Sequence, residues 1–343
     1  MSGLSIIVPA VGSIPALEGT LVSVLQHRPA GSEVLVVLNQ PYEDPYQLDG
    51  EVTFVQAPRG ATFAACGALG VERASGAIVN LVGCGCEVSE GWADAALPHF
   101  ANPQVAAVAP LVVHSLDEKR AIAAGVRYLA GGRRGLIAGA TADLAARGPV
   151  AVPGPCSWAA FFKKTAFILA GGFSGEVASP LADADLAVAL AAGGWKTVFE
   201  PRCRMRALGD LADEPHGFRY GLGAERLFWR NAPAVGWWRA LALHPWSVLR
   251  EIAGELPHPR GLAQLAGRLV GAVQMGRYPR RYAQLAALSH MAAEARACVA
   301  TLESSPSVRR RIDPAHPPET SVGSPAVIRP ERRQAEQRFE ARG

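Results

Sequence analysis

The sequence predicts an α/β protein, with a mostly parallel β-sheet flanked by helices and a helical extension after it. Short apolar runs alternate with segments of helical periodicity over residues 4–200, which is typical of a parallel sheet covered on both faces. Several runs, such as residues 33–38, are too apolar to have one face in water. A length of 343 residues, 49% of them hydrophobic, is enough for one large domain and an appendage.

The first part of the chain contains five of the expected strands. Pro9 ends the first strand, and apolar residues at helical spacing define the helix after it. The Ala-rich helix that begins near Gly60 is closed by Gly76, a typical C-cap residue. In chain order we expect strand 4–9, helix 17–26, strand 33–38, strand 52–55, helix 60–76, strand 78–82, helix 90–100 and strand 105–113.

The next part begins with a segment that lacks a clear pattern. Residues 114–155 are rich in Gly and Arg and have little apolar periodicity, so we expect a long loop over the mouth of the sheet. Regular elements then return, and the last strand is expected to stop before Pro201. In chain order we expect strand 157–162, helix 164–170, helix 182–192 and strand 195–199.

The C-terminal part is expected to be helical and then disordered. Residues 303–343 mix Pro, Ser, Arg and Glu with few large apolar groups, a composition typical of disorder. The Arg- and Trp-rich stretch 226–250 has no acidic residue, which fits either an interfacial helix on anionic lipid or a helical cap whose tryptophans pack on the sheet. We therefore divide the chain into a sheet domain (1–216), a helical extension (217–302) and a tail (303–343).

Composition and motifs exclude several classes of protein. A net charge of +4 and the lack of any nucleic-acid-binding motif argue against a nucleic-acid partner. Six scattered cysteines and no signal sequence at the N-terminus favour a reducing cytoplasm, and no apolar run reaches the ~18 residues of a membrane span. The turn after the first strand, residues 10–14, is not a Gly-x-Gly-x-x-Gly turn, and no P-loop occurs.

The stretch 78–87 is where we expect the chemistry. Its apolar strand ends in Gly83-Cys84-Gly85-Cys86, and glycines at a strand end let a ligand or another backbone approach closely. In open α/β sheets, ligands bind at this carboxyl edge. Cys84 and Cys86 are either half of a soft-metal site or small residues at a crowded strand end. No second cysteine or histidine pair with zinc spacing accompanies them.

In the order of its segments the chain resembles a family 2 glycosyltransferase with the GT-A fold. It is most similar to the rhamnosyltransferase-like branch that builds bacterial surface polysaccharides. The resemblance spans roughly residues 4–231 and rests on segments 5–9, 20–25, 33–37, 60–76, 91–92, 161–173 (ending in Gly-Gly-Phe), 183–186 and 194–201.

The resemblance implies transfer of a sugar from a nucleotide-sugar donor to a glycan or lipid-linked acceptor in cell-surface polysaccharide synthesis. Asp183 aligns with the general base that takes the proton from the acceptor hydroxyl. Its other interpretation is a helix N-cap, and Asp185 is expected to cap or to face solvent. The implied donor-binding residues are Pro9, Asn39, Arg59, Gly60, Gly83 and Gly85.

The chain also departs from the family at the donor site. The family's metal-binding Asp-x-Asp falls on Gly83-Cys84-Gly85, and glycines offer no side-chain oxygen to Mg²⁺ or Mn²⁺. A metal cofactor of the usual kind is therefore not expected, and Glu87 is the only nearby acid that could be a displaced ligand. The strand-end aspartate near the nucleotide base is replaced by Leu38, and Ala207 stands where many members have a histidine, with His216 nine residues on.

Two functions remain open from the sequence. In the first, the protein is a transferase in which arginines (Arg59, Arg204 and Arg206) clamp the diphosphate without metal, because guanidinium groups fit phosphate oxygens. These arginines could equally be ordinary surface residues. In the second, it is a non-catalytic GT-A scaffold that binds glycan or a partner transferase. Either could contact the inner face of the membrane through the helical extension.

Overall fold

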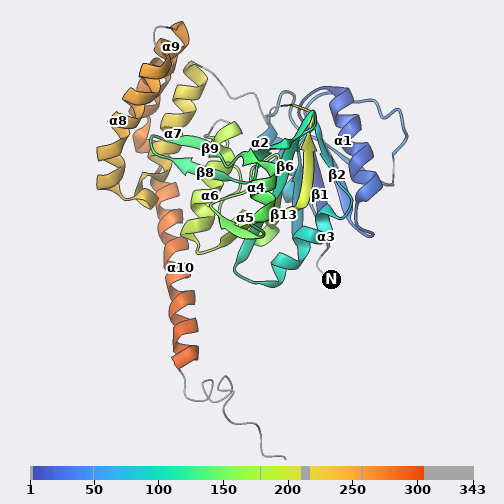
Figure 1. Ribbon diagram of the computed structural model, residues 1–343. Helices are drawn as coiled ribbons and strands as arrows, with labels where there is room; N and C mark the ends of the chain where they lie inside the picture. The colour runs from blue at the N-terminus through green and yellow to red at the C-terminus, as the bar shows by residue number, and fades with distance from the viewer. Residues whose placement is uncertain (1–2, 49, 178, 210–216, 256–257, 305–343) are drawn as a thin grey trace, which may run out of the picture. The chain divides into compact units, whose positions relative to one another are not determined.

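The computed structural model describes residues 3–48, 50–177, 179–209, 217–255 and 258–304 (Figure 1). His216 and most of the tail expected to be disordered lie outside these residues. The described residues form an eleven-stranded sheet and a two-stranded hairpin, with helices around them. Residues up to Ala295 belong to one compact unit, so the division between residues 216 and 217 stays a prediction.

The sheet is mostly parallel, as predicted. Its parallel part runs in the order β4-β1-β2-β3, and β12 lies antiparallel between β4 and β6. β13 continues the sheet as a parallel neighbour of β6. The strands are β1 (Leu4–Ala10), β2 (Glu33–Leu38), β3 (Thr53–Gln56), β4 (Ile78–Val82), β5 (Cys86–Val88), β6 (Val105–His114), β12 (Ala159–Lys163) and β13 (Lys196–Ala207).

Helices cover both faces of this sheet because its strands are apolar on both sides. Along β1, Ile6 and Val8 face one core with α1, whereas Ile7 faces the other core with α2 and α6. Alternate residues of one strand therefore serve two separate cores, as expected for a buried parallel sheet. The flanking helices are α1 (Ile14–His27), α2 (Phe63–Arg73), α3 (Trp92–Ala96), followed by the 3-10 turn Leu97–Ala101, α5 (Lys164–Leu169) and α6 (Ala182–Ala192).

The segment expected to be a long loop is instead built from short elements. Its strands are only two to seven residues long, too short for a periodic signal in the sequence. The β8–β9 hairpin turns through Gly131 and Gly132, both at positive φ, and Gly132 meets the backbone of α7 so closely that a Cβ would not fit. The elements are β7 (Asp117–Ala123), β8 (Val126–Leu129), β9 (Arg133–Leu136), β10 (Gly139–Ala140), α4 (Thr141–Ala146) and β11 (Val150–Val152).

The last strand is also longer than predicted. β13 continues through Pro201 to Ala207, and its register against β6 shifts between Glu200 and Arg204. Proline is tolerated within a sheet at such an irregularity, because no ladder hydrogen bond is required of its nitrogen there. This extension places Arg204 and Arg206 beside β5.

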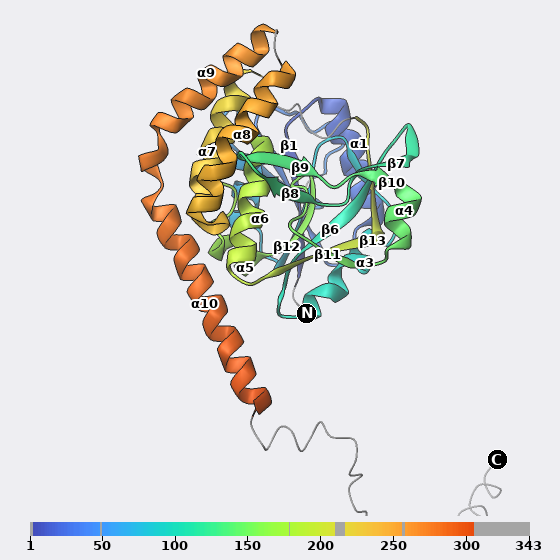
Figure 2. The ribbon, with the colours of Figure 1, turned by 60° about the vertical axis from the view of Figure 1, so that its left-hand side comes forward.

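The helical extension contains α7 (Phe218–Val235), α8 (Trp237–Glu255), α9 (Pro259–Val273), a 3-10 turn (Met275–Arg277) and α10 (Pro279–Ser304). α7 packs tightly on α9 because glycines line the contact. A Cβ added to Gly221 would lie 2.0 Å from the Gln264 carbonyl oxygen, and one added to Gly267 would lie 2.1 Å from that of Phe218. α7 also contacts α6 and β9, so the extension is anchored beside the hairpin (Figure 2). In the part of the chain that the structure describes, no helix is long and apolar enough to cross a membrane.

Candidate functional site

The carboxyl ends of β1, β2 and β4 meet at one edge of the sheet, where the donor was expected. The space between them is nearly filled. Ala10, Gly12, Leu38 and Cys84 line a cavity of only about 10 Å³, which is room for about one water molecule. Pro9 lies within β1 and pairs in register with Val37. This cavity is too small for a nucleotide base.

The loop after β3 is the part of this edge that remains open. Asn39 donates from Nδ2 to the carbonyl oxygen of Ala61 (2.9 Å) and accepts from the Gly60 N–H (3.0 Å). These bonds tie the end of β2 to the start of α2. Arg59 is exposed on this loop without a carboxylate partner among the described residues, and no atom lies within 4 Å of a Cβ built on Gly60.

Gly83 is covered by an aromatic pair that the sequence did not predict. Its N–H donates to the Trp158 carbonyl oxygen (2.8 Å), and a Cβ added to Gly83 would lie 2.2 Å from the Trp158 ring. That ring stacks on Phe63, with centroids 4.7 Å apart and planes 5° from parallel. An aspartate at position 83 would therefore collide with Trp158 where the ring now stands.

Gly85, Cys84 and Cys86 are packed against the fold. The Gly85 N–H donates to Thr20 Oγ1 (2.9 Å), and the Gly85 carbonyl oxygen accepts from the Leu208 N–H. The Cys84 thiol points to the Ser13 carbonyl oxygen, and burial raises the pKa of Cys84 to about 11. Burial raises the pKa of Cys86 further still. Both thiols stay protonated at neutral pH, and soft metals bind the thiolate, so the interpretation as small buried residues fits.

Asp183, the expected general base, is fully engaged in a buried ion pair. Arg134 Nε donates to both carboxylate oxygens (2.9 and 3.1 Å), and Arg134 Nη2 donates to Oδ2 (2.8 Å). The Ser157 N–H and hydroxyl also donate to Oδ2 (3.1 and 3.3 Å). Asp183 is 1% exposed. It is not the N-cap of α6, because Leu181 occupies that position and Asp183 lies within the first turn.

Asp185 does not face solvent, contrary to the prediction. It is fully buried, and it accepts from Arg230 Nε (3.0 Å to each oxygen) and from Asn231 Nδ2 (2.7 Å). Arg281 Nη2 lies 3.3 Å from the same carboxylate. The two aspartates of α6 point in different directions. Asp183 faces the β8–β9 hairpin, whereas Asp185 anchors α7 and α10.

Of the three arginines expected to clamp a diphosphate, Arg204 and Arg206 lie together on β13, whereas Arg59 is not among the residues that line their pocket. Arg204 and Arg206 pair with Glu118 (3.3 and 3.6 Å), and Arg206 also pairs with Glu87 (3.6 Å). They line a pocket of about 350 Å³ beside His27, the last residue of α1. The nearly closed crevice lies at the first residues of that helix, so Arg204 and Arg206 face a different part of the molecule.

A divalent metal does not fit the residues around Gly83. Within the described residues, no group of three or more His, Cys, Asp or Glu side chains is placed to hold a metal ion. Glu87 on β5, the acid proposed as a displaced ligand, is paired with Arg206 on β13. The hard oxygen ligands that Mg²⁺ or Mn²⁺ requires are therefore missing from this edge as described.

Sequence reasoning missed three residues that decide the state of the site: Arg134, Ser157 and Trp158. Arg134 lies in the segment that we expected to be a loop, and 49 positions separate it from Asp183. The strands β8 and β9 have four residues each, too few to leave a periodic signal that could have revealed it. Trp158 stood at the edge of a correctly predicted strand, but its stacking on Phe63 depends on tertiary packing.

Comparison of the sequence with protein-family models and with curated proteins finds no match. The backbone is similar to solved structures. GalNAc-T7 with UDP, GalNAc and Mn²⁺ is 12% identical, with a TM-score of 0.51, over 66% of this chain and 47% of that chain. The mannosyltransferase PcManGT from Pyrobaculum calidifontis, in complex with GDP-Man and Mn²⁺, is 17% identical, with a TM-score of 0.48, over 84% and 86%.

The similarity to GalNAc-T7 defines the class of fold. The chain has the GT-A fold of nucleotide-sugar glycosyltransferases, which confirms the predicted fold class. The chain spans about half the length of GalNAc-T7. At such low identity the likeness concerns the fold alone, because one fold can carry many functions.

Proposed function

We propose that this chain is a glycosyltransferase-like protein, related to the rhamnosyltransferase-like branch of family 2, that acts as a non-catalytic scaffold in cell-surface polysaccharide synthesis. In this role it binds a glycan or a partner transferase and does not itself transfer a sugar. The observation that carries the proposal is the buried pair between Asp183 and Arg134.

A general base needs an accessible oxygen with a free lone pair. The Asp183 carboxylate accepts five hydrogen bonds from Arg134 and Ser157, whereas a carboxylate has about four lone-pair sites. Asp183 therefore has neither the exposure nor the spare acceptor capacity to take a proton from an acceptor hydroxyl.

The donor side supports the same proposal. A diphosphate leaving group needs its developing charge neutralised, by a metal ion or by cationic side chains. No group of three or more His, Cys, Asp or Glu side chains is placed to hold a metal ion among the described residues, and Trp158 covers the position of the first family aspartate. Arg204 and Arg206 are already paired with Glu118 and Glu87.

One observation favours transfer of a sugar as a second candidate function. Arg59 is exposed beside the open loop at Gly60, near the end of β2, where the implied nucleotide would lie. If Arg134 released Asp183, the Asp183 carboxylate could act as the base, and Arg59 could contact a phosphate of the nucleotide sugar. In that case the acceptor, the donor sugar and the linkage would be ones used in polysaccharide synthesis.

Calorimetric titration of the full chain with UDP-, GDP- and dTDP-sugars, with and without Mn²⁺, separates the two functions. We expect no binding in any titration. Binding with a dissociation constant of about 1 mM or tighter, equivalent to about −4 kcal/mol, would overturn the scaffold proposal if nucleotide release followed in the presence of an acceptor. Binding that depends on Mn²⁺ would mean that a metal site forms here after all. The matched variant is Arg59→Gln, which should abolish any donor binding that uses the open loop.

A further inference from the structure

We propose that the outer faces of α8 and α9 form a docking surface for an anionic lipid bilayer. We call this surface the α8–α9 outer face and define it by six exposed apolar side chains: Trp238, Trp246 and Leu249 on α8, and Leu262, Leu269 and Val273 on α9. This proposal does not depend on the proposed scaffold role. A protein can be held at a membrane in this way whether or not it is an active transferase.

On α8 the apolar side chains form a stripe opposite the face that packs on the protein. Residues 238, 242, 246, 249 and 253 recur at three- and four-residue spacing and are all exposed, so they lie on one side of the helix. The other side packs through Ala240, His244 and Glu251. Trp238 is 88% exposed and Trp246 is 67% exposed.

α9 repeats this arrangement beside α8. Its inner side contacts α7 through Gly267 and Gly271, while Leu262, Leu269 and Val273 point outward, the last 87% exposed. Glu251 of α8 holds the two helices together. It accepts from Gln264 (2.7 Å) and from Arg268 (2.6 Å), both on α9. The two stripes therefore belong to one rigid helical hairpin.

Exposed apolar side chains are concentrated in the helical extension. Thirteen of the 21 exposed large hydrophobic residues found among the described residues lie between Phe218 and Met291. Isolated exposed apolar residues are normal, but a contiguous patch marks a surface that another apolar phase covers. Tryptophan is the residue type most suited to the headgroup region of a bilayer, because its ring is apolar and its N–H is polar.

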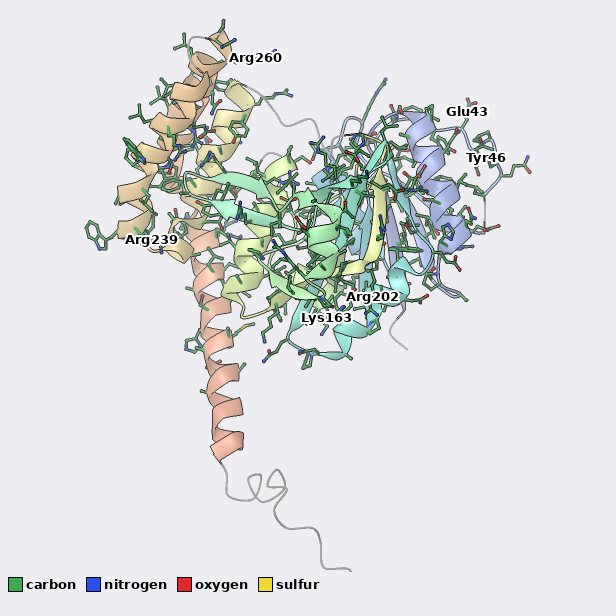
Figure 3. All side chains as sticks on the ribbon, viewed as in Figure 1. Glu43, Tyr46, Lys163, Arg202, Arg239 and Arg260 are labelled. Carbon is green, nitrogen blue, oxygen red and sulfur yellow. The ribbon has the colours of Figure 1, made fainter. Side chains whose placement is uncertain are left out.

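Charge makes this surface complementary to anionic lipid. Residues 218–291 contain ten Arg and three Glu, a formal charge of +7, whereas residues 1–217 contain 15 Lys or Arg and 20 Asp or Glu, a charge of −5. Two of the ten arginines, Arg230 and Arg281, are buried against Asp185 and do not contribute to the outer face. Two of the three glutamates, Glu225 and Glu251, are bound by Arg268. Exposed Arg239, Arg250 and Arg260 have no carboxylate partner in the described chain, and Figure 3 shows Arg239 and Arg260 projecting from the first turns of α8 and α9.

Two other occupants fit this surface less well. A second copy packed about a two-fold axis would bring the same patch against itself, which would place arginines opposite arginines. A nucleic acid would pair with the arginines, but it offers no apolar phase for Leu249, Leu262 and Val273. A bilayer with anionic headgroups satisfies the arginines and the apolar stripe together.

The test is flotation of the purified full chain with vesicles of phosphatidylcholine alone or of an equimolar mixture with phosphatidylglycerol. We expect binding to the anionic vesicles only. The variant Arg239→Gln/Arg250→Gln should weaken it roughly 20- to 30-fold, because each arginine near such a surface contributes about a fivefold factor. Trp238→Ser/Trp246→Ser should weaken binding about tenfold or more through lost apolar burial. In the wild type, brominated lipids should quench tryptophan fluorescence.

Matched controls remove the same groups elsewhere on the surface. Arg73→Gln/Arg147→Gln removes two exposed arginines away from the helical extension, and Leu116→Ser removes an apolar side chain that is 89% exposed; both should bind like the wild type. Failure to float with anionic vesicles overturns the proposal, as does equal loss in the controls. A dimer in sedimentation equilibrium that Trp238→Ser/Trp246→Ser converts to a monomer would overturn it in favour of a second copy. None of these outcomes changes the result expected from the titration with nucleotide sugars. The lipid-docking proposal and the scaffold proposal can therefore be overturned independently.

Discussion

The carboxyl edge of the sheet and the α8–α9 outer face use the same kinds of residue in opposite ways. At the sheet edge, Arg134 is buried against Asp183, and Trp158 is stacked on Phe63. On the outer face, Arg239 and Trp238 project into solvent without a partner among the described residues. The first region satisfies its polar and aromatic groups internally, whereas the second offers them to something outside the chain.

This difference indicates which region of the molecule can bind something outside the chain. In open α/β sheets the carboxyl edge is the usual place for a ligand, and here the hairpin β8–β9 and Trp158 fill it. Side chains that are saturated by their own protein have little left to bind a substrate. The side chains that are free to bind something outside the chain therefore lie on α8 and α9, which belong to the helical extension and not to the sheet.

The largest expected effect comes from breaking the buried pair. Asp183→Ala or Arg134→Ala should lower the free energy of unfolding by about 3–5 kcal/mol, because each leaves an uncompensated buried charge. Urea denaturation measures the change, with Asp143→Ala on the exposed side of α4 as the control. A loss below about 1 kcal/mol at Asp183 would mean that its carboxylate is not committed to the fold, and the comparison between the two regions would break.

The sequence predicted the strands at the carboxyl edge of the sheet but not the side-chain pairs that occupy this edge. Apolar runs such as residues 33–38 and 78–82 specify buried strands by composition alone, so these strands and their carboxyl ends were correctly placed. The pairing of Arg134 with Asp183 joins two elements distant in the chain, and the strands that carry Arg134 are too short to leave a periodic signal. Burial of Asp185 was likewise invisible, because its partners Arg230 and Arg281 come from the helical extension.

A smaller effect is expected where Gly83 meets Trp158. Gly83→Ala forces a methyl group into the ring and should destabilise the fold by about 1–3 kcal/mol, the usual range for overpacking. In the Trp158→Ala background the same substitution should cost clearly less, since the ring that it strikes is gone. A double-mutant cycle by chemical denaturation measures this coupling. Purely additive effects would show that Trp158 does not cover the donor edge.

The inner side of the helical extension should respond to acid. Burial on its own raises the pKa of Glu225, but hydrogen bonds from His244 and Arg268 outweigh it and hold the pKa below the ordinary value of 4.5. Glu225 therefore stabilises the fold above the unfolded-state pKa, and this contribution is lost as pH falls through the lower folded-state pKa.

The measurement is the melting temperature of the wild type and of Glu225→Gln as a function of pH. The difference between the two should be constant near neutral pH and should shrink below about pH 4.5. A difference that stayed constant into strong acid would show that Glu225 is not ionised in the folded helical bundle. Arg268 would then depend on Glu251 of α8 for its counter-charge.

The smallest expected effect is on the α8–α9 outer face. Trp238→Ser and Arg250→Gln should change the free energy of unfolding by no more than about 0.5 kcal/mol, because exposed side chains without internal partners contribute little to stability. The same urea denaturation used for Asp183 gives a direct comparison, with Ala240→Ser on the packed side of α8 as a contrast that should destabilise. If Trp238→Ser were as costly as Ala240→Ser, the outer face would be part of the fold's own packing, and the argument that it is free to meet a bilayer would lose its basis.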